Sequence, residues 1–209
     1  MTEWEHALQG CQNCERGLDP RNTVQEGKPT GKTVGLPPLG AKILAPCTYM
    51  IVRSQPAWNK NESTAAFSDP SGEKFVKWLE KKVGFPVQDT FLTNLVKCAI
   101  KNDDVTNVPT YYFRRCKGWF YAELGLVMPK VIIALGKVTW EVLGGEFDRF
   151  TLLSDPFNWG HQYTVYGTWT PDYVDRNRDK VDDYTTMFYK VMKWVEELKV
   201  NKKKNLPPL

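Results

Sequence analysis

Short apolar runs of strand-forming residues alternate with helix-like patterns along this chain. Strands are expected at residues 49–53, 90–96, 131–135 and 163–166. Between them, apolar residues recur at the spacing of three and four that is typical of a helix packed on one face. Because helices that connect such strands cover the faces of the sheet, this alternation predicts an α/β fold with a parallel or mixed sheet.

Three helices and two irregular segments are also predicted. Asp69 is a candidate N-cap, and Pro70 follows at the first helical position, where proline is favoured. Further helices are expected over residues 111–127 and 184–198, the second with a clear apolar stripe. A surface loop is expected at 26–46 and a frayed basic tail at 200–209, within a single domain of residues 1–209.

Composition indicates a cytoplasmic protein. The N-terminus is acidic where a secretory signal is basic and then apolar, and no apolar run is long enough to span a bilayer. Lys and Arg total 28 against 24 Asp and Glu, a formal charge of +4 that permits a polyanionic partner without requiring one. In a reducing compartment, clustered cysteines indicate a metal site rather than disulfides.

Four of the five cysteines fall into two pairs. Cys11 and Cys14 form a C-x2-C pair, and Cys98 and Cys116 are separated by 17 residues. Four thiolates suit one zinc ion or one [4Fe-4S] cluster, and spacing alone does not separate the two. The alternative for Cys98 is a small buried hydrophobic residue at the end of an apolar strand. Cys47 is expected to be structural.

Several segments carry motifs in a fixed order along the chain. They are Cys11-Gln-Asn-Cys14, residues 21–27 (RNTVQEG), Phe67 with Gly72, residues 93–98 (TNLVKC), Cys116 and residues 129–136 (PKVIIALG). Together they resemble the iron–sulfur (family 4 type) branch of the uracil-DNA glycosylase superfamily. The resemblance implies a central, mostly parallel four-stranded sheet flanked by helices in three layers, α/β/α. It also implies a [4Fe-4S] cluster held by Cys11, Cys14, Cys98 and Cys116, with zinc as the alternative.

The resemblance places Asn94, Phe67 and Gln55 in a substrate pocket. A base must leave the DNA stack before its glycosidic bond becomes reachable. An Asn amide can accept a hydrogen bond from N3–H of uracil and donate one to O4, a pattern that cytosine does not offer, while Phe67 would supply a stacking face. The alternatives are a strand-end turn residue for Asn94 and a core aromatic for Phe67.

The catalytic positions depart from the family pattern. The family motif G-E-A-P-G aligns with residues 53–57 (RSQPA), and H-P-S aligns with residues 170–172 (TPD). Ser54 therefore replaces the acidic residue, and Thr170 replaces the histidine. Cleavage builds positive charge on the sugar and negative charge on the departing base, so losing both groups removes much of the expected stabilisation. Ser54, Asn59 and Thr170 are the candidate catalytic residues, and Asn59 could position a water.

The segment after Pro171 lies where the family inserts an apolar wedge into DNA. Tyr173 and Val174 are the wedge candidates, and Arg176 and Arg178 could contact phosphates. The acidic residues interleaved with them favour a solvated loop as the alternative.

Two functions follow from these patterns. The first is a DNA glycosylase, a hydrolase acting on N-glycosyl bonds, that recognises a flipped uracil or modified pyrimidine and cleaves it by a rearranged mechanism. The alternative is a non-catalytic DNA- or protein-binding module on the same fold. A zinc-bound interaction domain is a third hypothesis. The expected partner is single- or double-stranded DNA, and the chain is expected to be a monomer without membrane contact.

Overall fold

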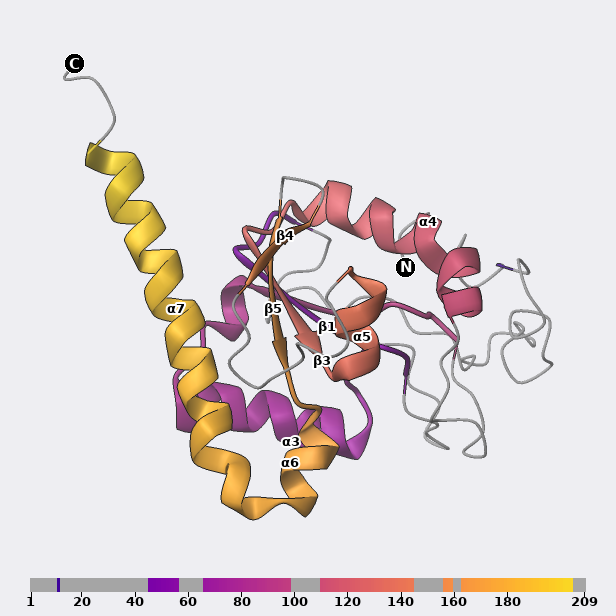
Figure 1. Ribbon diagram of the computed structural model, residues 1–209, viewed down its shortest axis with the longest axis horizontal. Helices are drawn as coiled ribbons and strands as arrows, with labels where there is room; N and C mark the ends of the chain where they lie inside the picture. Colours follow the sequence, from indigo (N-terminus) through magenta and orange to yellow (C-terminus); the bar gives the residue numbers. More distant parts are fainter. Residues whose placement is uncertain are drawn as a thin grey trace.

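The central element is a twisted sheet between two layers of helices (Figure 1). The computed structural model describes residue 11 and residues 45–56, 66–98, 110–144, 156–159 and 163–204. The strands are β1 (Tyr49–Arg53), β2 (Thr90–Asn94), β3 (Val131–Leu135), β4 (Phe157–Trp159) and β5 (Tyr163–Thr168). Their order is β2-β1-β3-β5-β4, with β4 antiparallel to β5 and the other pairs parallel.

The predicted α/β fold class is confirmed, with one correction to the strand number. The sheet has five strands rather than four, because β4 pairs along the outer edge of β5. β4 covers only Phe157–Trp159, and three residues are too few to show an alternating pattern in a sequence. The predicted strand at 90–96 ends at Asn94 in the structure, and the strand predicted at 163–166 continues to Thr168.

The structure has five α-helices within the described residues, and the one start signal predicted from the sequence is confirmed. They are α3 (Pro70–Trp78), α4 (Thr110–Val127), α5 (Lys137–Val142), α6 (Pro171–Arg176) and α7 (Val181–Lys204), with short turns η1 (Leu79–Val83), η2 (Val87–Asp89) and η5 (Arg178–Lys180). Asp69 caps α3 by accepting a hydrogen bond from the backbone N–H of Gly72, as predicted. α7 runs through residues 200–204, which were assigned to the frayed tail, while residues 205–209 lie outside the described part.

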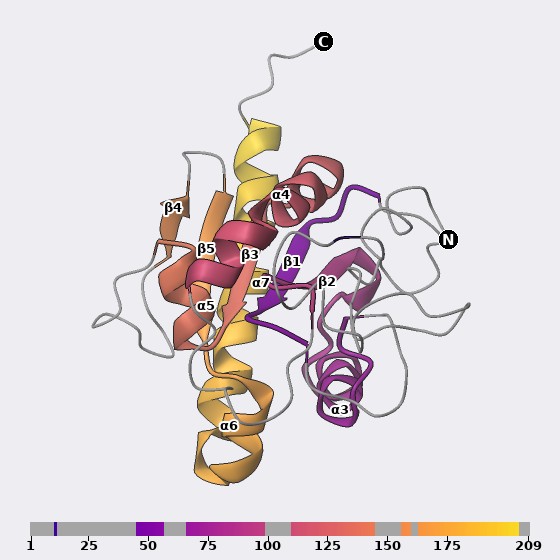
Figure 2. The same cartoon turned by 90° about the vertical axis from the view of Figure 1, so that its right-hand side faces the viewer.

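Alternate residues of each strand contact different helical layers. In β1, Tyr49 and Ile51 join a core with α3, α6 and α7, whereas Met50 and Val52 join a core with α4 and α5. This two-sided burial explains why the strands are nearly continuous apolar runs. Figure 2 shows α4 and α5 on one side of the sheet and α7 on the other. The structure is therefore the predicted three-layer arrangement.

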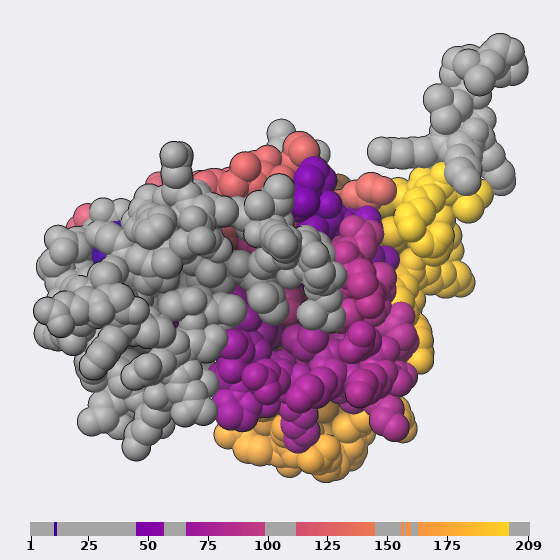
Figure 3. Space-filling model, turned by 180° about the vertical axis from the view of Figure 1, so that it is seen from behind, coloured from indigo at the N-terminus to yellow at the C-terminus, as the bar shows by residue number. Residues whose placement is uncertain are grey.

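The helices α3 and α6 meet beside the carboxyl edge of the sheet. The Ser71 hydroxyl bonds to the Asp172 carboxylate at 2.5 Å, and the Lys74 ammonium pairs with Asp175 at 2.7 Å. In Figure 3, α6 (orange) lies directly below α3 (purple). Among the described residues, no helix combines the length and the apolar character needed to cross a membrane.

Candidate functional site

The carboxyl ends of the four parallel strands lie in one row. Arg53 of β1 is paired with Asn94 of β2 on one side and with Leu135 of β3 on the other, and Leu135 is paired with Thr168 of β5. From β1 the chain crosses to β2 on one side and then to β3 on the other, so the strand order reverses there. In open α/β sheets, ligands bind outside the carboxyl ends at such a reversal.

Arg53 connects three side chains at this edge. Its Nε donates a hydrogen bond to Oδ1 of Asn94 at 2.8 Å, and its Nη2 pairs with Oδ2 of Asp69 at 2.5 Å. The guanidinium carbon also lies 4.5 Å from the centre of the Phe67 ring, within the range of a cation–π contact. The side chains of Arg53 and Asp69 are only 14% and 6% exposed. The edge therefore holds a charged pair that is almost closed to solvent.

The Asp69 carboxyl is held in its charged form. Burial alone would raise its pKa, but the hydrogen bond and charge of Arg53, together with the Gly72 N–H, bring that pKa below the ordinary aspartate value. Both carboxylate oxygens are occupied, Oδ1 by Gly72 and Oδ2 by Arg53. Asp69 thus fixes both the start of α3 and the position of the Arg53 guanidinium.

Phe67, whose ring contacts Arg53, has an unusual backbone conformation. Phe67 has a φ of 61°, which is rare for a residue other than glycine, and its side chain is 2% exposed. A Cβ on Gly72 would lie 2.4 Å from the Phe67 carbonyl oxygen, so only glycine fits there. The Phe67 ring also stacks on Phe75 of α3. The structure therefore explains both residues of the motif: Phe67 packs its ring against Arg53 and Phe75, and Gly72 leaves room for the Phe67 backbone.

A buried ion pair holds the end of β2 against α4. The Lys97 ammonium contacts Glu123 at 2.6 Å, the Thr93 hydroxyl at 2.8 Å and the Asn94 carbonyl at 2.7 Å. The side chains of Lys97 and Glu123 are 1% and 0% exposed. Burial lowers the pKa of Lys97, and the charge and hydrogen bond of Glu123 oppose that shift. This network holds the backbone of Asn94 in place through its carbonyl oxygen.

The chain resembles known proteins across this same region. A family model for the uracil DNA glycosylase superfamily matches residues 45–196, more than half of the chain. The chain belongs to the uracil DNA glycosylase superfamily. The type-4 uracil-DNA glycosylase of Sulfurisphaera tokodaii is 24% identical over 112 residues, which are 49% of this chain and 47% of that protein. The chain thus matches about half the length of that curated relative, in agreement with the predicted family 4 branch.

The candidate catalytic residues differ in how the structure holds them. Ser54 follows β1 directly, and its carbonyl accepts from the Val96 N–H at 2.9 Å. Gln55 beside it is buried. The Thr170 hydroxyl accepts from the Tyr173 N–H at 3.3 Å and thereby caps α6. Asn59 lies outside the described residues. The superfamily roles of these residues remain predictions.

The predicted DNA-contact segment forms a helix. It spans η5 and α6, and α6 begins at Pro171. Tyr173 is 38% exposed, whereas Val174 is 7% exposed and packs into the core with α3 and α7. Arg176 and Arg178 are exposed. Val174 therefore holds α6 to the body of the domain, and the wedge role of Tyr173 stays a prediction.

Three of the four predicted metal ligands lie in the described part. Cys98 and Cys116 are buried, and Cys116 packs with Val96. The Cys11 sulfur accepts a hydrogen bond from the Trp119 indole at 3.3 Å, one turn beyond Cys116 on α4. Cys14 lies outside the described residues. Within the described ranges, no group of three His, Cys, Asp or Glu side chains is arranged to hold a metal ion.

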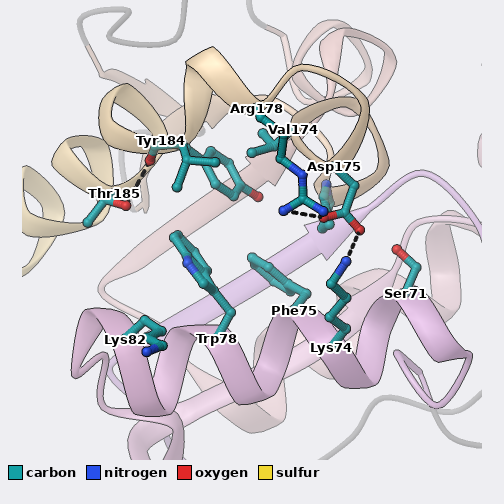
Figure 4. A pocket seen from close by; sticks show the side chains of 12 residues that line it. Ser71, Lys74, Phe75, Trp78, Lys82, Val174, Asp175, Arg178, Tyr184 and Thr185 are labelled. Carbon is teal, nitrogen blue, oxygen red and sulfur yellow. Dashed lines mark hydrogen bonds and ion pairs between the residues drawn. The ribbon is translucent and has the colours of Figure 1, made fainter.

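A separate cavity of about 390 Å³ lies between α3, α6 and α7 (Figure 4). Phe75, Trp78 and Tyr184 form much of its apolar wall, and the Lys74–Asp175 pair stands at its rim. The buried Tyr184 hydroxyl has no hydrogen-bond partner among the described residues. Neither Asn94 nor Arg53 lines this cavity, so it is distinct from the group of side chains at the carboxyl edge.

Proposed function

We propose that this protein binds DNA, recognises a flipped uracil or modified pyrimidine through Asn94, and cleaves its N-glycosidic bond with a rearranged set of catalytic groups. The observation that carries the proposal is the position of Asn94. Its side chain is fully buried at the carboxyl end of β2 and accepts a hydrogen bond from Arg53, which also covers Phe67, inside the segment that matches the superfamily. A base-reading amide needs such a preorganised and dry setting, because water would otherwise satisfy its hydrogen bonds.

The chemistry expected of the pocket follows from its side chains. The Asn94 amide supplies both an acceptor and a donor, which matches N3–H and O4 of uracil. The Phe67 ring supplies a stacking surface, a contact worth about 1–3 kcal/mol per base. The Ser54 hydroxyl carries no charge, so it could orient a water but cannot balance positive charge on the sugar as a carboxylate does. Backbone and amide donors would have to stabilise the departing base.

A second candidate function is a DNA-binding module that has lost cleavage. A specific observation favours it: the Thr170 hydroxyl is held at the start of α6 by the Tyr173 N–H, and unlike a histidine it cannot carry a positive charge to stabilise a leaving group. The Asp69 carboxylate is also committed, with both oxygens accepting hydrogen bonds. The remaining catalytic candidates are then Ser54 and Asn59, neither of which carries a charge.

We propose that Cys11, Cys14, Cys98 and Cys116 hold a [4Fe-4S] cluster with a structural role. The donor chemistry fits, since four thiolates are the usual ligands of such clusters. The Trp119–Cys11 hydrogen bond supports the proposal because it brings the N-terminal cysteine to the turn after Cys116.

An oligonucleotide panel tests the proposed function. The protein is incubated with single- and double-stranded DNA containing uracil, 5-substituted pyrimidines or only ordinary bases, and abasic sites are detected by alkaline cleavage. Abasic sites at one modified base are expected. Binding that persists and weakens with salt, but without any abasic site, would support the second candidate. Absence of any DNA binding would contradict both.

The variant Asn94→Ala tests the role of the amide. We expect it to lose discrimination between the target base and cytosine while its salt-dependent affinity for DNA stays nearly unchanged, because backbone contacts carry that affinity. Asn158→Ala is the matched control, since Asn158 is exposed on β4 at the opposite edge of the sheet. Equal loss of discrimination and backbone affinity in Asn94→Ala would show that Asn94 is structural.

A further inference from the structure

The Arg53 side chain uses the two contacts that a pyrimidine would need. Its Nε donates to Oδ1 of Asn94 at 2.8 Å, the atom proposed to accept from N3–H of uracil. Its guanidinium lies over the Phe67 ring at 4.5 Å. The Phe75 ring packs against the same ring with the centroids 6.0 Å apart, and Phe67 is only 2% exposed, so the ring has no free surface. The two groups proposed to read and stack a base are therefore both engaged by one residue of the chain itself.

The shape and charge of the guanidinium explain this arrangement. It is planar, like a pyrimidine ring, and it presents N–H donors in its own plane, as uracil presents N3–H. A planar cation also stacks favourably on an aromatic face. The guanidinium and a base cannot lie on the same face of Phe67 at once, because each needs a van der Waals separation from the ring. A base can enter only when Arg53 leaves.

Arg53 also departs from the motif of the family that this chain resembles. In the alignment of G-E-A-P-G with residues 53–57, Arg53 stands where the pattern has glycine. A glycine has no side chain and leaves that volume open. The change to arginine therefore alters the pocket directly, in addition to the changes at the catalytic positions.

We propose that Arg53 is the specificity-determining residue of this pocket and that it closes the pocket to a free base. The inference rests on the proposed function of Asn94 and deepens it. Asp69 holds Arg53 in the closed position by an ion pair at 2.5 Å. To open the pocket, the guanidinium must exchange Asp69 for another anion. A DNA phosphate is suited to this, since guanidinium groups bind phosphates in bidentate fashion.

The consequence is that base affinity depends on the fraction of molecules in which Arg53 is displaced. A ligand that binds only the open form has an apparent affinity reduced by the open fraction. A nucleobase alone offers no phosphate and must displace Arg53 unaided. DNA can supply both the base and the anion that receives the guanidinium. Arg53 therefore links recognition of the base to docking of the DNA backbone.

Binding of free uracil tests this inference. Ligand-observed NMR or calorimetry would compare uracil with cytosine for the wild type, Arg53→Ala and Arg53→Ala/Asn94→Ala. We expect Arg53→Ala to bind uracil at least about tenfold more tightly than the wild type, because it frees one stacking face and one acceptor. The affinity for cytosine should increase much less, and the double variant should not show the increased affinity for uracil.

Two further variants keep the test decisive. Arg53→Lys retains a positive charge that can pair with Asp69, so it should fold. It has no planar group to stack on Phe67, so its affinity for uracil should lie between those of the wild type and Arg53→Ala. Arg114→Ala removes the same charge from an exposed position on α4 and should match the wild type. Thermal unfolding of each variant shows whether it is folded.

Several outcomes would overturn the inference. One is an equal affinity for uracil in the wild type and in Arg53→Ala. Another is an increase in cytosine affinity as large as the increase in uracil affinity. The third is an increase in uracil affinity that persists in Arg53→Ala/Asn94→Ala. The proposed function is judged separately, by salt-dependent binding of the wild type to base-containing oligonucleotides. A wild type that binds free uracil as well as Arg53→Ala does, and also selects the target base in DNA, would reject the role of Arg53 and leave the proposed function intact.

Discussion

The ion pair between Arg53 and Asp69 makes a pH-dependent contribution to stability. The folded protein lowers the pKa of Asp69, so folding favours the charged carboxylate. An unfolded aspartate titrates at about 3.9. The contribution is therefore complete above that value and is lost as the pH falls through the lower pKa of the folded state.

Replacement of Asp69 by Asn should remove this pH dependence. Asn is as good an N-cap as Asp, so α3 should still begin at Pro70, but the Arg53 charge is left without its partner. We expect Asp69→Asn to lose about 3 kcal/mol of unfolding free energy at pH 7. The deficit should shrink as the pH falls below about 4, because the unfolded aspartate then takes up a proton while the folded carboxylate still stays charged. Urea unfolding between pH 7 and pH 3 measures both values.

A deficit that stays constant down to pH 3 would show that the carboxylate charge is not the source of the stability. Asp179→Asn serves as the control, because Asp179 is exposed and its ion-pair partner among the described residues is its neighbour Lys180. Exposed pairs of this kind contribute little to stability. That variant should follow the wild type at every pH.

Residue types with a local signature could be predicted from the sequence, and those defined by distant contacts could not. Asp69 as an N-cap follows from the Asp-Pro pair, and the cap is present. Asn94 was predicted within a strand over residues 90–96, and it is the last residue of β2. The role of Arg53 was missed because its partners are Phe67, Asp69 and Asn94, which lie up to 41 positions away. The one feature of the sequence that indicates such contacts is the position of a charged residue at the end of a buried strand, because a buried charge requires a partner.

At the scale of elements, the Lys97–Glu123 pair joins β2 to α4. Both side chains are at most 1% exposed, and Lys97 also bonds to Thr93 and to the Asn94 carbonyl. A buried charge that loses its partner is strongly destabilising, whereas replacing both partners by apolar groups is often nearly neutral. The pair should therefore behave as a unit.

A double-mutant cycle tests that expectation. Lys97→Met and Glu123→Leu should each lower the unfolding free energy by about 3–5 kcal/mol, and the double variant should lose clearly less than the sum of the two. Urea unfolding at pH 7 gives all four values. Strict additivity would mean that each residue stabilises the fold independently and that β2 and α4 are held together by other contacts.

Long, periodic elements were predicted well because their pattern repeats. β1 and β3 have their predicted bounds, and α4 and α7 enclose the predicted helices. β4 and α5 were missed, with three and six residues respectively. Elements this short contain less than two turns or two alternations, so tertiary pairing decides them. The segment around Tyr173 became a helix because Thr170 and Pro171 supply a start signal like that of α3.

At the scale of the whole molecule, the family and the layered fold were predictable because the motifs occur in one order along the chain. The arrangement of thiols was not, since a cysteine spacing gives donor number but not distance. The structure adds one discriminating fact. The Cys47 thiol donates to the Ala45 carbonyl, and burial, aided by the Asp89 charge, raises its pKa to about 11. A thiol that resists ionisation is a poor ligand, which makes Cys47 a control for the four proposed ligands.

Loss of the proposed cluster should affect the molecule as a whole, since it would join the N-terminal segment to β2 and α4. Protein purified without oxygen should be brown, with broad absorption near about 400 nm and about four iron atoms per chain. Cys116→Ser should lose colour and iron, whereas Cys47→Ser should keep both. Because a cluster binds the folded state, its loss should also lower Tm, by about 4–8 °C if it stabilises by about 2 kcal/mol. A colourless wild type with one zinc would assign the thiols to zinc, and iron retained in Cys116→Ser would remove that residue from the site.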